Sequence, residues 1–259
     1  MARQKRIALI NDITGFGRCS VTVQLPLISA MRVQACPLPT AILSVHTGFP
    51  NHYLDDYTER MRPYMENWAA NALEFDAILT GFLGSERQIE VVLECIARFK
   101  QRHTQLVVDP VMGDNGSLYS SYTPALCAKM RQLLPQADVV TPNLTEACQL
   151  LGTDYPTGGL VTEDELAQMA AAIAAMGPRA VIITGLHADE NVRTYLYADG
   201  CGRSFDNPKV GRDRSGAGDA FSAIIAAALV RGISLAEGVP RAADFIGHCL
   251  TYAEELDLP

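Results

Sequence analysis

Lysine is scarce in this sequence: Lys5, Lys100, Lys129 and Lys209 are the only four among 259 residues. Arginine therefore carries most of the positive charge, and the formal net charge at pH 7 is −8. Proteins that bind nucleic acid regardless of its sequence need a basic surface to pair with phosphates. The charge balance therefore argues against a nucleic-acid partner.

Long apolar runs are also absent. The longest, Ala220–Val230 with Ser222 inside it, is too short to span a bilayer. The basic residues within Met1–Arg6 precede an apolar run, Ile7–Ile10, that is too short for the core of a signal peptide. We therefore expect no signal peptide and no membrane partner.

No two cysteines have CxxC spacing. The cysteines are odd in number and scattered along the chain: Cys19, Cys36, Cys95, Cys127, Cys148, Cys201 and Cys249. This pattern favours reduced thiols in the cytoplasm over a disulfide framework or a zinc site. A cytoplasmic protein is the resulting prediction.

Two common phosphate-binding motifs are missing as well. No GxxxxGK[ST] sequence occurs, which excludes a P-loop. Thr14–Ser20 follows an apolar run and precedes a helical one, as in a Rossmann fold, but Ser20 stands where the third glycine belongs. No acidic residue lies between Ile13 and Leu54, where an NAD site needs one to hold the ribose. A dinucleotide site is therefore not expected.

Apolar runs and helical periodicities alternate along the whole chain. The expected strands are Arg6–Ile10, Ala35–Leu43, Phe75–Leu79, Gln105–Val108, Ala137–Val140 and Ala180–Thr184. The expected helices cover residues 20–31, Asp55–Leu73, Gln88–Arg102, Pro124–Leu134, Glu163–Met176, Ala217–Arg231 and Leu235–Leu256. This alternation predicts one α/β domain, residues 1–259, with helices on both faces of a mostly parallel sheet. Val192–Tyr197 and Gly202–Phe205 add a small antiparallel hairpin at its edge.

The most informative stretch is Asp-Arg-Ser-Gly-Ala-Gly-Asp-Ala-Phe-Ser, residues 213–222. Gly216 and Gly218 free the backbone just before a helix, whose N-terminal N–H groups suit an anion. Asp219 would repel a phosphate there, unless it accepts the proton of a hydroxyl that attacks a phosphoryl group. A tight turn followed by a first-turn acid is the simpler alternative.

This stretch resembles the C-terminal signature of the ribokinase-like small-molecule kinases, so a ribokinase-like α/β/α sandwich is expected. The resemblance implies an anion hole formed by the backbone of Gly216, Ala217 and Gly218, with Asp219 as catalytic base. We expect the helix N-terminus to favour ionised Asp219, making it a weak base that acts mainly by positioning.

Two further segments, Asp109-Pro-Val-Met-Gly113 and Thr141-Pro-Asn-Leu-Thr-Glu146, resemble the pyridoxal and hydroxymethylpyrimidine kinases. The resemblance implies that ATP is bound by Asp109, Thr141, Asn143, Glu146, Thr184, Lys209 and Val210. It also implies that Asp109 and Glu146 support Mg²⁺, and it leaves a monovalent cation open. Taken alone, Asp109 could cap a turn, and Asn143 with Glu146 could form a helix capping box.

The segment Ser44-Val-His-Thr47, together with Asn11, resembles the pyridoxal kinase branch. The resemblance implies that Asn11, His46, Thr47, Gly48 and Asp219 contact the vitamin. His46 alone could equally be a turn histidine bonded to the backbone. Asn11 replaces the serine of many pyridoxal kinases, and the Arg214–Asp219 sequence is closer to the sugar-kinase form, so the vitamer preference stays open.

The predicted activity is ATP-dependent phosphorylation of the hydroxymethyl group of pyridoxal, pyridoxamine or pyridoxine. The alternatives are a hydroxymethylpyrimidine kinase of thiamine synthesis and a non-catalytic pyridoxal-binding protein. The resemblance also implies a homodimer. Two details stay undecided: whether residues 114–122 form a mobile flap or only a loop, and whether Arg212 and Arg214 contact ATP or solvent.

Overall fold

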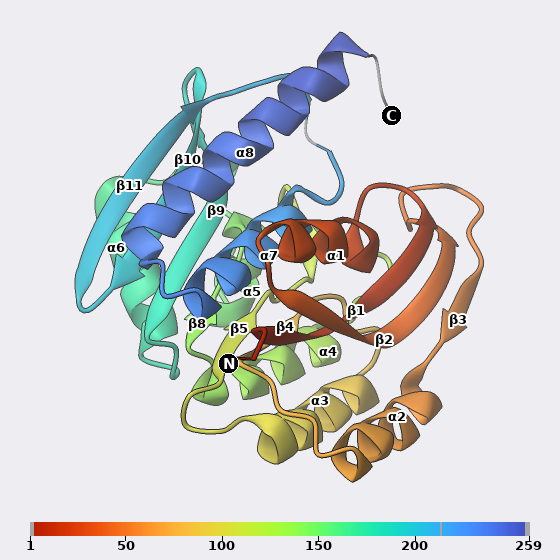
Figure 1. The fold of residues 1–259 in the computed structure, drawn as a ribbon. Helices are drawn as coiled ribbons and strands as arrows, with labels where there is room; N and C mark the ends of the chain where they lie inside the picture. The colour runs from red at the N-terminus through yellow and green to blue at the C-terminus, as the bar shows by residue number, and fades with distance from the viewer. Residues whose placement is uncertain (1–2, 213, 257–259) are drawn as a thin grey trace.

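The computed structural model describes residues 3–212 and 214–256, and one large sheet organises them (Figure 1). Its strand order is β11-β10-β9-β8-β5-β4-β1-β2-β3. The strands are β1 Arg6–Phe16, β2 Gln34–Val45, β3 Leu54–Asp56, β4 Ala77–Thr80, β5 Gln105–Val108, β8 Val139–Val140, β9 Ala180–Ala188, β10 Asn191–Ala198 and β11 Cys201–Pro208. Strands β6 Gly113–Asp114 and β7 Ser117–Leu118 form a separate two-stranded sheet.

Helices cover both faces of the large sheet (Figure 1). One layer contains α1 Ser20–Ala30, α7 Ala217–Val230 and α8 Leu235–Glu255. The other contains α2 Thr58–Ala70, α3 Glu86–Phe99, α4 Pro124–Met130, α5 Leu144–Leu151 and α6 Glu163–Ala174, with short 3₁₀ helices at Arg131–Gln136 and Thr157–Gly159. No helix in the described part of the chain is long and apolar enough to cross a membrane.

The central strands are parallel, as the alternation of strands and helices predicts. Parallel pairing joins β2, β1, β4, β5, β8 and β9 in that spatial order. Strands β10 and β11 form the predicted antiparallel hairpin at one edge. The ribokinase-like α/β/α sandwich with a small edge hairpin is therefore confirmed.

The core is divided by the sheet, because successive side chains of a strand point to opposite faces. Ile7 and Leu9 pack with Ile225 on the face of α7, whereas Ala8 and Ile10 pack with Val92 on the face of α3. Burying each large aliphatic side chain contributes about 1.5–3 kcal/mol. Helix α7 is apolar on nearly every side because α1, α8 and the sheet surround it (Figure 1).

Several expected boundaries are wrong, and two of these differences change the sheet. Strand β1 does not end at Ile10 but continues to Phe16, because a register shift between Asn11 and Ile13 keeps it paired with β2. The start of the helix expected from Asp55 is instead the end of β3, which pairs antiparallel with Ala41–Leu43, and α2 begins at Thr58. Pro37 and Pro39 lie in the part of β2 that β3 does not cover, and such an edge position tolerates proline.

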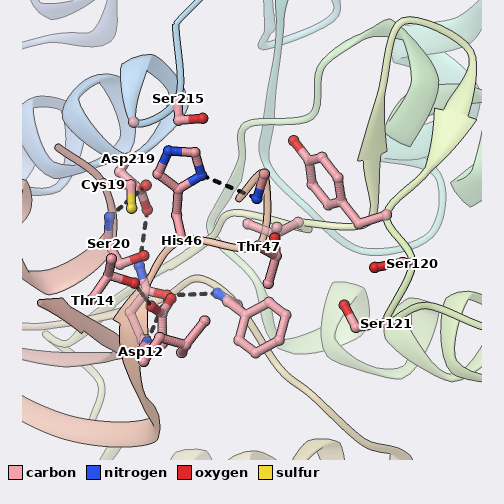
Figure 2. Close-up of a pocket in the computed structure, with 17 residues that line it drawn as sticks. Asp12, Thr14, Cys19, Ser20, His46, Thr47, Ser120, Ser121, Ser215 and Asp219 are labelled. Atoms are coloured by element: carbon pink, nitrogen blue, oxygen red, sulfur yellow. Dashed lines mark hydrogen bonds between the residues drawn. The ribbon is translucent and has the colours of Figure 1, made fainter. Parts of the chain in front are cut away.

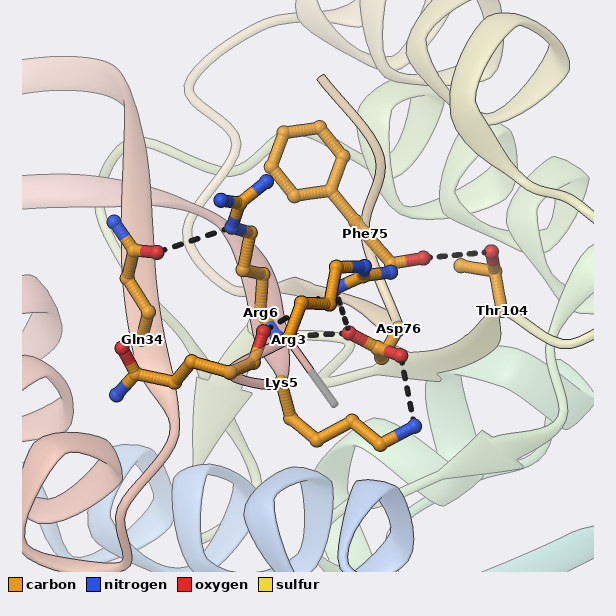
Figure 3. A network of polar contacts seen from close by, with 8 residues as sticks. Arg3, Lys5, Arg6, Gln34, Phe75, Asp76 and Thr104 are labelled. Carbon is orange, nitrogen blue, oxygen red and sulfur yellow. Dashed lines mark hydrogen bonds and ion pairs between the residues drawn. The ribbon is translucent and has the colours of Figure 1, made fainter. Parts of the chain in front are cut away.

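A buried carboxylate anchors the end of the sheet opposite the strand C-termini (Figure 3). Asp76 is 5% exposed and accepts hydrogen bonds from the Arg6 backbone N–H at 2.9 Å, Arg3 at 2.7 Å and Lys5 at 3.0 Å. Burial acts to raise the Asp76 pKa, but the hydrogen bonds from Arg6, Lys5 and Arg3 outweigh it, so the pKa is lowered.

We expect Asp76→Asn to lower the free energy of unfolding by about 1–3 kcal/mol at pH 7, because charge-assisted bonds are lost. Since the folded-state pKa is lowered, this stabilisation is complete above the unfolded pKa of about 3.9 and disappears as the pH falls through the folded value. Urea unfolding at pH 7 and pH 3 measures it, with exposed Asp154→Asn as the control. An equal loss at both pH values would contradict the ionic origin.

Candidate active site

A cavity of about 250 Å³ opens at the C-terminal ends of the parallel strands, where open α/β sheets bind ligands. It gathers residues that are distant in sequence and that the sequence predicts for substrate and catalysis: Asn11, His46, Thr47, Gly48, Gly216 and Asp219. Figure 2 shows Asp219, Cys19 and Ser20 on one side of His46, with Ser120 and Ser121 on the other.

Asp219 lies in the first turn of α7 and is held from the opposite end of the chain. Its Oδ1 accepts a hydrogen bond from Asn11 Nδ2 at 2.9 Å, and its Oδ2 accepts one from the Ser20 backbone N–H at 2.7 Å. Burial raises the Asp219 pKa to about 6, which the hydrogen bond from Ser20 opposes and the negative charge of Asp12 reinforces. The expectation of a weakly basic Asp219 is therefore wrong, because burial outweighs the helix N-terminus.

The backbone before Asp219 is the segment that the sequence predicts as an anion hole. Gly216 is the N-cap of α7 with φ +90°, and no side chain among the described residues caps the helix by a hydrogen bond. A Cβ at Gly216 would lie 1.7 Å from the Arg18 carbonyl oxygen, whereas one at Gly218 would meet nothing within 4 Å. Gly216 therefore lets this loop pack against Arg18, and the backbone at Gly218 borders open space, which suits a phosphoryl group.

His46 is held in one orientation by its neighbours. The Gly48 backbone N–H donates to His46 Nδ1 at 3.1 Å, so in the neutral ring the proton resides on Nε2. Phe49 contacts the ring edge-on at 4.8 Å. A Cβ at either Gly17 or Gly48 would approach the ring to 2.8 Å, so both glycines make room for it. The sequence also allows His46 to be a turn histidine bonded to the backbone, and this hydrogen bond is present. It leaves the Nε2–H group as a donor.

Asn11 lines the cavity but is fully engaged by the protein. Its Oδ1 accepts hydrogen bonds from the backbone N–H groups of Asp12 and Phe82, and its Nδ2 donates to Gln24 and Asp219. An amide has two acceptor and two donor positions, and all four are used here. Contact between Asn11 and the substrate ring stays a prediction. It would be a van der Waals contact, because the protein already uses every hydrogen-bonding position of the amide.

Asp109 and Glu146 lie beside the cavity, and both are buried, at 5% and 4% exposure. Burial raises the Asp109 pKa, and the charge of Asp219 raises it further. Burial also raises the Glu146 pKa, with the charge of Asp109 adding to it. These carboxylates lie close enough to destabilise one another, and a cation would relieve this repulsion.

Asn143 and Glu146 form the capping box that the sequence leaves as an alternative. Asn143 Oδ1 accepts from the Glu146 N–H, and Glu146 Oε2 accepts from the Asn143 N–H, each at 2.9 Å. Asn143 Nδ2 also donates to the Gly113 carbonyl, and the Met112 N–H donates to Glu146 Oε1. A parallel bridge between Asn143 and Thr184 links the residue three positions after β8 to the middle of β9.

The described residues fit a hydrated Mg²⁺ and a nucleotide phosphate. No three His, Cys, Asp or Glu side chains among them converge into a protein-only metal cluster. Mg²⁺ commonly takes one or two carboxylates together with waters and phosphates, so such a cluster is not needed. Thr141 Oγ1 is buried without a hydrogen-bond partner in the described structure, which suits a hydroxyl that a ligand satisfies.

The remaining predicted nucleotide residues lie outside this cavity. Lys209 is exposed at the end of β11, where its backbone N–H donates to the Glu190 carbonyl, and Val210 is partly buried. Arg214 pairs with Glu254 of α8 at 2.7 Å, so it is not simply a solvated charge. Arg212 is exposed, and Asp213 lies outside the described residues.

Several cavity residues are missing from the sequence prediction. They come from the Rossmann-like segment or the strand before it: Asp12, Thr14, Cys19 and Ser20. The sequence pattern marks this segment, but it assigns these residues no function. Burial, with the charge of Asp219, raises the Cys19 pKa to about 11, so it is an unreactive thiol. All seven cysteines are free thiols.

Tyr119, Ser120 and Ser121 line the cavity from residues 114–122, which the sequence leaves as either a flap or a loop. The segment begins with the β6–β7 hairpin, whose turn residues Asn115 and Gly116 both have positive φ, as in a type I′ turn.

The fold and the strand-end cavity define a small-molecule kinase of the ribokinase-like class. Within that class, the model of the phosphomethylpyrimidine kinase family matches residues 24–258. The chain belongs to this family, whose members and structural neighbours include pyridoxal kinases.

Relatives in sequence include both kinds of vitamin kinase. A hydroxymethylpyrimidine/phosphomethylpyrimidine kinase of Rhizobium meliloti is 30% identical over 93% of this chain and 89% of its own length. The pyridoxine kinase of Bacillus subtilis is 34% identical over 66% of this chain and 62% of its own. A thiamine biosynthetic bifunctional enzyme of Arabidopsis thaliana is 32% identical over 91% of this chain, which spans only 44% of that enzyme.

Solved structures agree with the fold. A Bacteroides thetaiotaomicron protein assigned to the phosphomethylpyrimidine kinases, crystallised with pyridoxal, is 39% identical with a TM-score of 0.90, over 94% of this chain and 86% of its own. Lactobacillus plantarum pyridoxal kinase is 28% identical with a TM-score of 0.90, over 98% and 91%. Staphylococcus aureus pyridoxal kinase with AMP-PCP is 25% identical with a TM-score of 0.83, over 96% and 89%. Kinase activity with ATP as a substrate follows from these relationships.

Proposed function

We propose that this kinase phosphorylates the hydroxymethyl group of a vitamin B6 compound: pyridoxal, pyridoxamine or pyridoxine. The observation that carries the proposal is the cavity in which Asp219, in the first turn of α7, lies near an oriented His46. The pyridoxal bound by the Bacteroides relative and the pyridoxal kinases among the structural neighbours support this substrate class.

Asp219 is the proposed general base. It accepts the proton of the hydroxymethyl group as that oxygen attacks the γ-phosphorus of ATP. A pKa of about 6 makes Asp219 a stronger base than an ordinary aspartate while it remains mostly ionised at neutral pH. The backbone amides of Gly216, Ala217 and Gly218 stabilise the charge on the transferring phosphoryl group. Nε2–H of His46 is available to donate to a polar substituent of the ring.

The nucleotide is proposed to lie beside this cavity, over the ends of β5, β8 and β9. Thr141, Asn143, Thr184, Lys209 and Val210 are its proposed contacts. Asp109 and Glu146 would hold Mg²⁺ through water, since backbone N–H groups already bind both Glu146 oxygens. When bound, Mg²⁺ neutralises charge on the phosphates.

A hydroxymethylpyrimidine kinase is the second candidate. The relatives of that name, which match over most of the chain, favour it. Its substrate also carries a hydroxymethyl group on a heteroaromatic ring, so the same Asp219 chemistry applies. A non-catalytic binding protein is less well supported, because carboxylates such as Asp109 and Asp219 oppose anion binding unless they take part in a reaction.

The test is Mg·ATP-dependent phosphorylation of pyridoxal, pyridoxamine, pyridoxine and hydroxymethylpyrimidine, with Asp219→Ala as the inactive control. We expect turnover of a B6 compound to exceed that of the pyrimidine. His46→Ala should raise the KM of the ring substrate about tenfold without raising the KM of ATP, and His52→Ala should change neither. Preferred turnover of the pyrimidine would replace the first proposal by the second.

A cytoplasmic location and a homodimer are also proposed. The free cysteines support the first. The exposed apolar side chains of Phe16, Ile42, Tyr53 and Leu54, near the β3 edge of the sheet, support the second. Light scattering should give twice the chain mass of 28.0 kDa, and the mass of a single chain would exclude the dimer.

A further inference from the structure

The proposed reaction leaves one part of the site without a purpose: the buried amides of Asn11 and Gln24 and the Rossmann-like loop before α1. We propose that Asn11 and Gln24, together with the backbone N–H of Ser20, position the Asp219 carboxylate for proton transfer. They are positioning residues, because they act on the base and not on the substrate. This inference rests on the proposed function. The proposed base is held in place by residues from the N-terminal part of the chain.

Each oxygen of the Asp219 carboxylate receives one hydrogen bond from this support. Asn11 Nδ2 donates to Oδ1 at 2.9 Å, and the Ser20 N–H donates to Oδ2 at 2.7 Å. Asn11 belongs to β1, Ser20 begins α1, and Asp219 lies in α7. Two donors from two elements define the plane of the carboxylate, and its remaining lone pairs stay available for a substrate hydroxyl.

The orientation of the Asn11 amide is itself determined by its surroundings. Its Oδ1 accepts from the backbone N–H groups of Asp12 at 2.9 Å and Phe82 at 2.8 Å. Rotating the amide by half a turn would place its NH₂ group against those two donors. Nδ2 must therefore face Gln24 and Asp219, and the side chain, which is fully buried, always presents a donor to the carboxylate.

Gln24 extends the support to the other side of α7. Its Oε1 accepts from Asn11 Nδ2 at 2.9 Å, which leaves its Nε2 to donate to Ser222 Oγ at 3.4 Å. Ser222 Oγ donates in turn to the Asp219 backbone carbonyl at 3.2 Å. Gln24 and Ser222 are both fully buried. The hydrogen bonds therefore run from the Asp219 side chain through Asn11, Gln24 and Ser222 back to the Asp219 backbone. An amide pair that served only to stabilise the fold would not need to contact Asp219 at both ends.

Backbone features at the same place accommodate this support. A Cβ at Gly81 would lie 2.4 Å from Asn11 Cγ and Nδ2, so glycine makes room for the amide. Ser20, which is not a glycine, has φ +55°, a conformation that costs about 1 kcal/mol or more. This conformation occurs in the residue whose N–H reaches Asp219. Strain kept at such a position is typical of functional sites.

The support should also determine how readily Asp219 ionises. Donors to a carboxylate stabilise its charged form, whereas burial and neighbouring acids oppose it. The titratable groups around Asp219 are Asp12 from β1, Cys19 before α1, His46 after β2, Asp109 after β5, and Tyr119 from the segment after β7. Four of these five are acids, and the hydrogen bonds from Asn11 and Ser20 oppose their effect on Asp219.

The decisive variant is Asn11→Leu, which keeps the shape of the side chain and removes its polar groups. We expect kcat at pH 7 to fall about 10- to 100-fold, with the KM of ATP changed less than twofold. The acid limb of kcat/KM should move upward by about one pH unit, because Asp219 becomes harder to ionise. Gly81→Ala, which keeps every polar group but displaces the amide, should shift the limb in the same direction if Asn11→Leu does not fold.

Gln88→Met is the matched control. Gln88 is a glutamine that is 1% exposed and donates to the Thr40 carbonyl at 2.8 Å and Thr58 Oγ1 at 2.9 Å, away from Asp219. Gln88→Met should lower the free energy of unfolding without moving the acid limb of kcat/KM, whereas Gln24→Met should move that limb to higher pH. An acid limb that is equal in wild type, Asn11→Leu and Gly81→Ala would overturn the proposal.

A readout without turnover separates this inference from the proposed function. In protein labelled with ¹³C at the aspartate carboxyls, NMR titration gives the Asp219 midpoint, and Asp219→Asn identifies its signal. The wild-type midpoint is expected near 6 and the Asn11→Leu midpoint above it. A shifted midpoint without any turnover would refute the vitamin kinase and keep the positioning role. If the enzyme phosphorylates a B6 compound but the Asp219 midpoint is the same in wild type and Asn11→Leu, the positioning role is refuted and the vitamin kinase is kept.

Discussion

Asp219→Asn is expected to lower kcat by about 10³-fold while leaving the KM of ATP within about twofold, because a general base contributes roughly 10²- to 10⁴-fold. The amide is nearly isosteric with the carboxylate but cannot accept the proton of the attacking hydroxyl. Its NH₂ group would also face the donors from Asn11 and Ser20, so some misplacement adds to the loss. Steady-state kinetics with the preferred vitamer measure both constants.

The pH profile gives this prediction a second test. Burial raises the Asp219 pKa to about 6, and the ionised form is the active one. Wild-type kcat/KM should therefore fall as the pH drops below about 6, and the residual activity of Asp219→Asn should lack that limb. Asp154→Asn, an exposed aspartate elsewhere, is the control for a general loss of charge. Nearly unchanged kcat in Asp219→Asn would remove Asp219 from the mechanism.

Gly216→Ala is expected to lower kcat at least about 100-fold, since losing one donor of a comparable anion hole costs 10²- to 10³-fold. The new Cβ would lie 1.7 Å from the Arg18 carbonyl oxygen, a backbone atom that cannot rotate away. Residue 216 also has φ +90°, which side chains rarely adopt. The loop must therefore move, and the amides at the start of α7 move with it.

Gly200→Ala separates this effect from the general cost of alanine at positive φ. Gly200 lies in the β10–β11 turn with φ +77°, and a Cβ there meets nothing within 4 Å. We expect it to lower stability by about 1 kcal/mol and to leave kcat unchanged. Thermal unfolding and kinetics of both variants provide the comparison. Equal kcat in Gly216→Ala and Gly200→Ala would show that loop packing at Arg18 does not support catalysis.

Local sequence patterns were sufficient for much of the architecture. Gln105–Val108 is predicted and observed as a strand with the same ends, because an apolar run between polar residues has few alternatives in an α/β chain. The start of α7 directly after Gly216, and the capping box of Asn143 and Glu146, also follow from short-range chemistry. Such features depend on residues within one or two turns of each other.

Other features depend on partners that are distant in the chain. The extension of β1 to Phe16 requires pairing with β2, which overrides the polar Asn11–Asp12 pair. The raised pKa of Asp219 arises from burial under segments about 200 residues away in sequence, where Ser20 and Asn11 are separated from it by 199 and 208 positions. A helix N-terminus considered alone indicates the opposite shift.

The sequence by itself determined the class of fold, the glycine-containing loop at Gly216–Asp219 and the family resemblance, because each is encoded in a short run of residues. Only the tertiary structure decided that the Rossmann-like Thr14–Ser20 segment places the Ser20 N–H on the Asp219 carboxylate. The physical reason is that hydrogen bonding and burial act through space. The amide of Asn11 and the N–H of Ser20 acquire their role only when the sheet brings β1 beside α7.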